Sequence, residues 1–237
     1  MPTFRPFTAL CLSAVFLSCS PAAPRKDHAM MKTRIELDPG MPLLPSPDKT
    51  PRVALGTDIR LVAGIGNTGR QDLAIEDPKG TQHIMIHVRS PQDTTESSFL
   101  LNPSEVDALG EMTALPHPEV WVKPGSYAPF RFSLYKNLMD KCLSEGLYQV
   151  AFSYDENRSA PATLIAEFAP ASVEPLVSIL DDAGRDMWVR KEALKWLRRL
   201  KADFAYDFAK PDSRAFLAWW NSVKGKPDLE ARFQTLR

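Results

Sequence analysis

Cysteine is scarce in this chain, with three residues, Cys11, Cys19 and Cys142, among 237. Cys11 lies within an apolar run near the N-terminus and Cys19 directly after it, so only Cys142 remains in the body of the protein. A small fold held together by several disulfides is therefore excluded. We expect Cys142 to be a buried, apolar residue, and a nucleophilic thiol is the alternative.

An excess of charge of one sign is also missing, because 29 Lys and Arg residues balance 29 Asp and Glu residues. Nucleic-acid-binding proteins carry a basic excess, so we expect no nucleic-acid partner. The catalytic motifs G-x-S-x-G and H-E-x-x-H are absent. His83 and His87 would share one strand face about 13 Å apart, too far to chelate one metal ion. The sequence therefore predicts no catalytic, metal-binding or cofactor-binding residue and no cofactor.

The first feature that the sequence does contain is a targeting segment. Arg5 provides a short positive region, and residues 7–17 (FTALCLSAVFL) form an apolar run that suits a signal peptide and is too short to span a bilayer. The run ends at Ser18-Cys19, which resembles a bacterial lipobox, where a small residue precedes a cysteine that is diacylated and becomes the new N-terminus. The resemblance implies a signal peptide over residues 1–18 and lipidation of Cys19.

This lipidation implies a membrane-anchored lipoprotein of the bacterial cell envelope that faces the periplasm or the exterior. Two alternatives remain open: cleavage after Ser20 or near Ala23 would give a secreted protein, and retention of the apolar run would leave an uncleaved anchor. Residues 19–32 are small, polar and proline-containing, which predicts a mobile tether between the membrane and the folded body.

Nine short segments after the tether have the composition and spacing of β-strands. They are residues 33–37, 58–65, 71–76, 83–88, 97–101, 119–122, 127–135, 146–154 and 163–168. Turn signals at residues 66–69 (GNTG) and 123–126 (KPGS) separate predicted strands. Because no helix intervenes, we predict an antiparallel β-sandwich over residues 33–170. The long loop at residues 102–118 is a possible location for binding.

The central strand of this sandwich is predicted at residues 146–154. Tyr148, Val150, Phe152 and Tyr154 alternate with smaller side chains, so they place one bulky face toward a core. Residues 144–150 (SEGLYQV) resemble the D-x-G-x-Y-x-C pattern of immunoglobulin-type strands, with Val150 in place of the disulfide cysteine. The resemblance implies an immunoglobulin-like β-sandwich in which Tyr148 has a structural role, its hydroxyl bonding to backbone at the strand corner.

The hydrophobic period changes at Ser172, which is suited to cap a helix. Residues 173–182 and 186–201 carry apolar side chains three and four positions apart, which predicts two amphipathic helices separated at Gly184. A third helix is predicted from its cap Asp212 through Trp219 and Trp220 to residue 223, and Gly225 and Pro227 signal its end. The expected fold class is therefore multi-domain, β then α, with a helical domain over residues 173–237.

The first two predicted helices resemble one HEAT-type helical repeat. The similarity lies in residues 176–182 (LVSILDD) and in the spacing of Asp186, Val189, Arg190, Ala193 and Leu197. It implies a close helix approach at Ala193 and a structural, stacking role for Arg190. One repeat leaves an apolar face exposed. We therefore expect a three-helix cap with Trp219 and Trp220 as structural residues, and packing of this face onto a partner is the alternative.

This helical segment is also expected to dock against the sandwich, because about 65 residues with four of the five tryptophans form a marginal core alone. Its basic residues fit a solvated helix face, with anionic lipid or phosphate contact as the alternative. Together these features favour a non-enzymatic envelope lipoprotein that acts as a protein- or peptide-binding or assembly module. Its expected partners are the membrane, through the N-terminal lipid, and an envelope protein. The alternative is a hydrolase-associated or inhibitory module acting on extracellular polymers or proteases.

Overall fold

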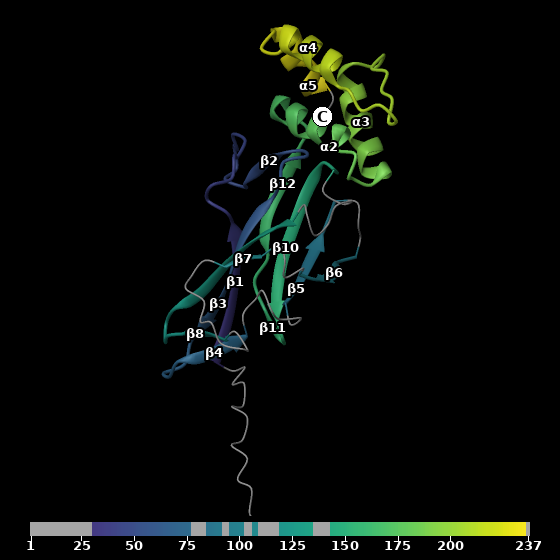
Figure 1. Ribbon diagram of the computed structural model, residues 1–237. Coiled ribbons are helices and arrows are strands. Elements are labelled where there is room, and N and C mark those ends of the chain that lie inside the picture. Colours follow the sequence, from purple (N-terminus) through teal and green to yellow (C-terminus); the bar gives the residue numbers. More distant parts are fainter. Residues whose placement is uncertain are drawn as a thin grey trace, which may run out of the picture.

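The computed structural model describes residues 30–76, 84–91, 95–101, 106–108, 119–134 and 143–235. Strands occupy the first part of the chain and helices follow from Pro170, as the β-then-α prediction required (Figure 1). The strands are β1 (Met31–Leu37), β2 (Arg52–Ala54), β3 (Arg60–Asn67), β4 (Leu73–Glu76), β5 (Ile84–Arg89), β6 (Ser97–Leu100), β7 (Val106–Ala108), β8 (Glu119–Val122), β9 (Tyr127–Ser133), β10 (Gly146–Tyr154), β11 (Asn157–Arg158) and β12 (Ala162–Glu167).

These strands form two main sheets and a small third one. The first sheet, called sheet A, has the order β1-β3-β9-β7, and the second, called sheet B, has the order β2-β12-β10-β5-β6 with β11 beside β10. β4 and β8 form a separate antiparallel pair. Each of the nine predicted strands is present, with both ends within two residues of the predicted ones, whereas the short strands β2, β7 and β11 were not predicted.

One strand pair departs from the predicted antiparallel arrangement. β2 runs parallel to β12, with Arg52 opposite Ile165 and Ala54 opposite Glu167. Parallel neighbours need a long connection between them, and here that connection is the chain from β3 to β11. No local sequence pattern around Arg52 indicates a partner strand more than a hundred residues away. The antiparallel prediction was therefore wrong for the pair β2–β12.

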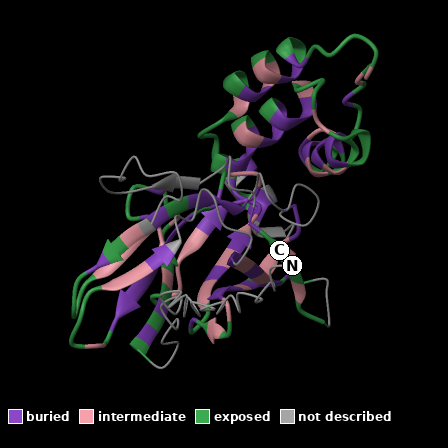
Figure 2. Ribbon diagram, turned by 60° about the horizontal axis from the view of Figure 1, so that its bottom comes forward, coloured by how far each residue is buried: buried purple, intermediate pink, exposed green. Residues whose placement is uncertain are grey.

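The core lies between sheets A and B. Tyr148, Val150, Phe152 and Tyr154 on β10 are all at most 1% exposed, which confirms the predicted alternation of that strand. The ring of Phe152 meets that of Phe130 on β9 edge to face, with the ring centroids 5.7 Å apart. Buried positions alternate with more exposed ones along β1 and β5, as expected of strands with one face in a core, whereas β3 is buried from Leu61 to Asn67 (Figure 2).

The helical part contains more helix than predicted. After a 3-10 turn at Pro170–Ser172, the α-helices are α2 (Val173–Asp181), α3 (Met187–Leu200), α4 (Arg214–Val223) and α5 (Pro227–Thr235). The N-cap of α4 is Ser213, although the Asp212 carboxylate accepts a hydrogen bond from the Arg214 N–H. Pro227 begins α5 instead of ending the helical region, because proline is favoured at the first position of a helix. The three-helix prediction is therefore wrong by one helix.

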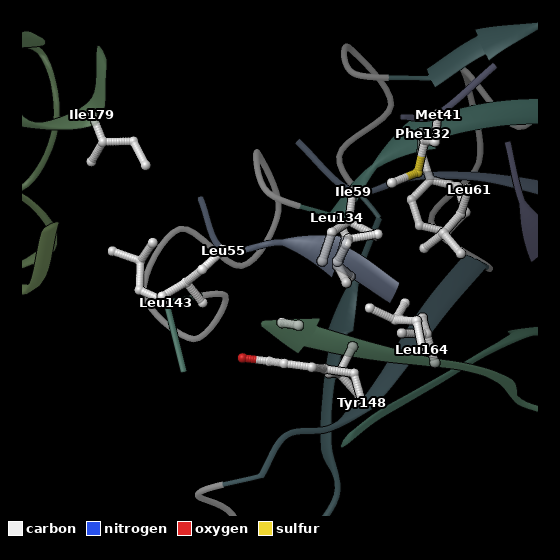
Figure 3. Close-up of a cluster of buried hydrophobic side chains, with 14 of the residues drawn as sticks. Met41, Leu55, Ile59, Leu61, Phe132, Leu134, Leu143, Tyr148, Leu164 and Ile179 are labelled. Atoms are coloured by element: carbon white, nitrogen blue, oxygen red, sulfur yellow. The ribbon is translucent and has the colours of Figure 1, made fainter. Parts of the chain in front are cut away.

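The helices pack against one end of the sandwich, as the sequence predicted. A continuous hydrophobic cluster includes Leu55, Leu143 and Tyr148 of the sandwich together with Ile179 of α2 (Figure 3). At Gly56, where φ is +83°, an added Cβ would lie 3.1 Å from the Leu176 side chain. The backbone of the sandwich therefore approaches α2 so closely that a larger residue at this position would disturb the contact.

Candidate functional site

Metal-ligating and membrane-spanning features are considered for the residues that the structure describes, 30–76, 84–91, 95–101, 106–108, 119–134 and 143–235. No group of three or more His, Cys, Asp or Glu side chains in this part of the chain is arranged to hold a metal ion. None of the described helices is long and apolar enough to cross a membrane. Cys19, Cys142 and His83 lie outside the described residues, as do His28 and His117. The predicted loop at residues 102–118 is described only at β7, which pairs with β9.

A polar cluster on the outer face of sheet B joins residues that no sequence motif connects. The ring of His87 on β5 has Nδ1 2.8 Å from Ser98 Oγ on β6 and Nε2 2.9 Å from Ser153 Oγ on β10. Glu96 lies 3.5 Å from Nδ1 and pairs with Arg158 of β11. We call these five residues the His87 cluster. Four of them lie on four different strands and Glu96 directly precedes β6, so only the folded sheet brings them together.

Burial and charge determine the protonation of this cluster. Desolvation of the ring lowers the pKa of His87 below its ordinary value of 6.5, the positive charge of Arg158 lowers it further, and Glu96 opposes the change. The hydrogen bond from Arg158 lowers the pKa of the Glu96 carboxyl. At neutral pH the imidazole is therefore neutral, with one nitrogen that donates a hydrogen bond and one that accepts.

The order of serine, histidine and carboxylate is that of an acyl-transfer site, which also requires an exposed nucleophile and free N–H donors for an oxyanion. Ser159 N–H donates to Phe152 C=O at 2.9 Å, so the backbone of Phe152 faces β11 and that of Ser153 faces β5. The N–H of Ser153 is therefore used in the ladder and cannot stabilise an oxyanion. Ser153 is also only 7% exposed. The geometry favours a hydrogen-bonded link between β5, β6 and β10 over nucleophilic catalysis.

Tyr148 occupies the strand corner predicted for it. Its hydroxyl donates to the backbone carbonyl of Ser144 at 2.9 Å, and the side chain is fully buried. Beside this corner, Leu143 C=O accepts a hydrogen bond from the Trp196 indole N–H at 2.8 Å. The Glu145 carboxylate accepts from Phe168 N–H at 2.7 Å and lies 3.6 Å from the Arg199 guanidinium. Residues 143–145 therefore connect β10, the end of β12 and α3.

Arg190 is buried within the helical part, with 3% of its surface exposed. Its Nε donates to Leu180 C=O at 2.8 Å, and its guanidinium lies 5.3 Å from the centre of the Phe208 ring. The Tyr206 hydroxyl lies 2.8 Å from both Leu180 C=O and the Asp181 carboxylate. Burial and the hydrogen bond to Asp181 raise the pKa of Tyr206. These contacts connect α2 and α3 with the segment that follows α3.

The tryptophans of the helical part divide into buried and exposed ones. Trp220 is buried and its ring centre lies 6.3 Å from that of Phe233, while Trp219 is partly buried beside Phe216. Trp188 at the start of α3 is instead 42% exposed, and the adjacent Met187 is 46% exposed. We call Met187 and Trp188 the distal pair, because α3 lies at the end of the sandwich opposite β4 and β8 (Figure 1).

Among these residues, sequence reasoning identified Tyr148, Arg190, Trp219 and Trp220 and missed the His87 cluster and the distal pair. The partners of His87 lie on other strands, so only the strand order could have indicated them. Met187 and Trp188 are apolar residues in the first turn of a helix, and the sequence pattern alone did not separate them from the buried stripe.

Comparisons with known proteins add no assignment. No protein-family model and no curated protein sequence matches the chain. Its fold is similar to part of the alkylpurine DNA glycosylase AlkC of Pseudomonas fluorescens, with 11% identity, 58% of this chain and 30% of that chain covered, and a TM-score of 0.35. The β-glucosidase EmGH1 of Erythrobacter marinus has 9% identity, with 57% of this chain and 15% of that chain covered, and a TM-score of 0.33. The CARDB domain of PF1109 from Pyrococcus furiosus has 12% identity, with 58% of this chain and 95% of that chain covered, and a TM-score of 0.28. The chain thus spans less than a third of either enzyme, and at these TM-scores the similarities support no inference about activity.

Proposed function

We propose that this protein is a cell-envelope lipoprotein that binds a protein or peptide without catalysing a reaction. Its N-terminal cysteine, Cys19, would be anchored in the membrane, and its folded body would combine an immunoglobulin-like sandwich with a HEAT-type helical unit. The observation that carries the proposal is that the two ends of the molecule differ. The described chain enters the sandwich at the β4–β8 end, and the helical part with its exposed distal pair lies at the other end (Figure 1).

Two observations support the immunoglobulin-like assignment. The order β1-β3-β9-β7 corresponds to strands A, B, E and D of an immunoglobulin constant-type domain, and β12-β10-β5 corresponds to G, F and C. In that correspondence β10 is strand F, which is the strand that carries the corner tyrosine. The hydrogen bond from Tyr148 to Ser144 has the expected partner, a backbone carbonyl a few residues upstream.

The HEAT-type assignment is supported by the contact between α2 and α3. Ala193 is fully buried, which agrees with a close approach of the two helices at that position. A single repeat covers one apolar side by packing on the sandwich, through contacts such as Phe168 with Trp196, whose ring centres are 5.1 Å apart. Met187 and Trp188, in the first turn of α3, are 46% and 42% exposed. Tryptophan and methionine are enriched at protein interfaces, so the distal pair fits a partner-binding surface.

Two experiments test this function. In the first, a fatty-acid probe labels the wild-type protein in cells, and we expect Cys19→Ala to abolish labelling. In the second, a photo-crosslinking amino acid replaces Trp188 in native envelopes, with the same replacement at the exposed Glu36 of β1 as the control. We expect a discrete adduct from position 188 only. Adducts of equal yield from both positions, or none from position 188, would reject the distal pair as the binding surface.

A further inference from the structure

The end of the sandwich at which the described chain begins has a compact structure organised around Asn67. This side chain is 2% exposed, and its amide nitrogen donates to Gln71 C=O at 2.6 Å and to Val122 C=O at 2.8 Å. Its amide oxygen accepts from Gly69 N–H at 2.8 Å. One buried asparagine therefore holds the loop after β3 against β8, and we call Met30, residues 66–72 and residues 121–126 the base.

The position at which the N-terminal segment meets the base is fixed by two hydrogen bonds. Met30 C=O accepts both the Thr68 N–H at 2.7 Å and the Thr68 hydroxyl at 2.8 Å. From Cys19 to Met30 the chain advances eleven residues, which can span at most roughly 40 Å. A lipid on Cys19 would consequently hold the base close to the bilayer surface.

The base exposes side chains that suit this surface. Trp121 on β8 is 56% exposed and Met30 is 41% exposed. Arg70 and Lys123 are exposed basic residues of the base, and Asp72 is its acidic residue. Tryptophan is enriched at membrane–water interfaces, and each Lys or Arg near an anionic bilayer contributes attraction. An exposed tryptophan with a basic surplus at the end where a lipid tether enters therefore indicates a bilayer as the neighbour.

We propose that the base is a membrane-contacting surface, in which Trp121 and Met30 enter the interfacial region and Arg70 and Lys123 face anionic lipid phosphates. This inference rests on the proposed lipid anchor, which would hold the base close to the bilayer. Acyl chains supply the anchoring, so the contact of the base determines orientation: it keeps the sandwich upright and the distal pair away from the bilayer.

The test uses residues 19–237 carrying Cys19→Ala, so that no acyl chain contributes to binding. Co-sedimentation is measured with phosphatidylcholine vesicles with and without phosphatidylglycerol. We expect stronger partitioning with phosphatidylglycerol, a decrease on the order of twentyfold for Arg70→Gln with Lys123→Gln, and a decrease of about fivefold or more for Trp121→Ala. Trp188→Ala, which removes an exposed tryptophan from the opposite end, is the matched control and should change little.

A second readout uses the acylated protein in vesicles with brominated lipids, which quench tryptophans that lie in the interface. Quenching should be lost in Trp121→Phe and retained in Trp188→Phe. The proposal is overturned if the variants at Trp121 and Trp188 lose binding or quenching equally. It is also overturned if the unacylated protein binds vesicles with and without phosphatidylglycerol equally. The sedimentation result is independent of the anchor, because fatty-acid labelling can fail while vesicle binding of the unacylated protein through Trp121 persists, and the reverse can also occur.

Discussion

Glu145 provides a direct test of how the helical part is held on the sandwich. Phe168 is 2% exposed and follows the last residue of β12, so its N–H lies beyond the ladder with β10 and depends on the Glu145 carboxylate, 2.7 Å away. The second carboxylate oxygen faces Arg199 of α3 at 3.6 Å, in a pair whose side chains are 28% and 34% exposed. Glu145→Ala removes both interactions, whereas Glu145→Gln retains an oxygen that accepts the Phe168 N–H.

The two substitutions should therefore differ in their effect on stability. A buried donor left without an acceptor costs about 1–3 kcal/mol, and an ion pair at this exposure contributes less than about 1 kcal/mol. We expect Glu145→Ala to lower the free energy of unfolding by about 2–3 kcal/mol and Glu145→Gln by about 1 kcal/mol or less. Glu156→Ala, at an exposed turn position, is the control and should stay within about 0.5 kcal/mol of wild type.

Urea unfolding followed by circular dichroism and by tryptophan fluorescence provides the measurement. Four of the five tryptophans lie in residues 173–237, so fluorescence reports mainly on the helical part and circular dichroism on the whole chain. Because the hydrophobic cluster is continuous across the junction, we expect the two transitions of the wild type to coincide. Equal losses for the alanine and glutamine variants would show that the charge, and not the hydrogen bond to Phe168, holds the junction.

Three further predictions concern single side chains. Tyr148→Phe leaves the buried Ser144 carbonyl without its donor and should lower the free energy of unfolding by about 1–2 kcal/mol in urea; no loss would contradict the corner role. Arg190→Lys removes the Nε–H that donates to Leu180 C=O and should lower the free energy of unfolding by about 1–3 kcal/mol, whereas a lysine variant of wild-type stability would refute this role. The pKa of His87 is lowered in the folded state, so the unfolded chain binds more protons and stability falls as the pH drops through 6.5. His87→Gln should flatten this dependence in unfolding measurements at several pH values, and equal slopes for both proteins would count against it.

Several features of the fold could be predicted because the interactions behind them are local. The alternation along β10 follows from a period of two within nine residues, and the Tyr148 hydroxyl reaches a carbonyl four residues upstream. The change from strands to helices at Pro170–Ser172 follows from the change in hydrophobic period. Pro227 shows where local rules are ambiguous, since proline is compatible with both the end of one helix and the start of the next.

The remaining features depend on contacts between distant segments. His87 meets Ser153 across 66 positions, Trp196 reaches Leu143 across 53, and Arg52 lies 2.8 Å from Glu167 across 115. The sequence by itself determined nine of the strands and the helices α2, α3 and α4, since periodicity and turn chemistry act over a few residues. The tertiary structure alone decided which strands are neighbours, which polar groups meet on sheet B and which tryptophans stay exposed, because these depend on the pairing and packing of whole elements.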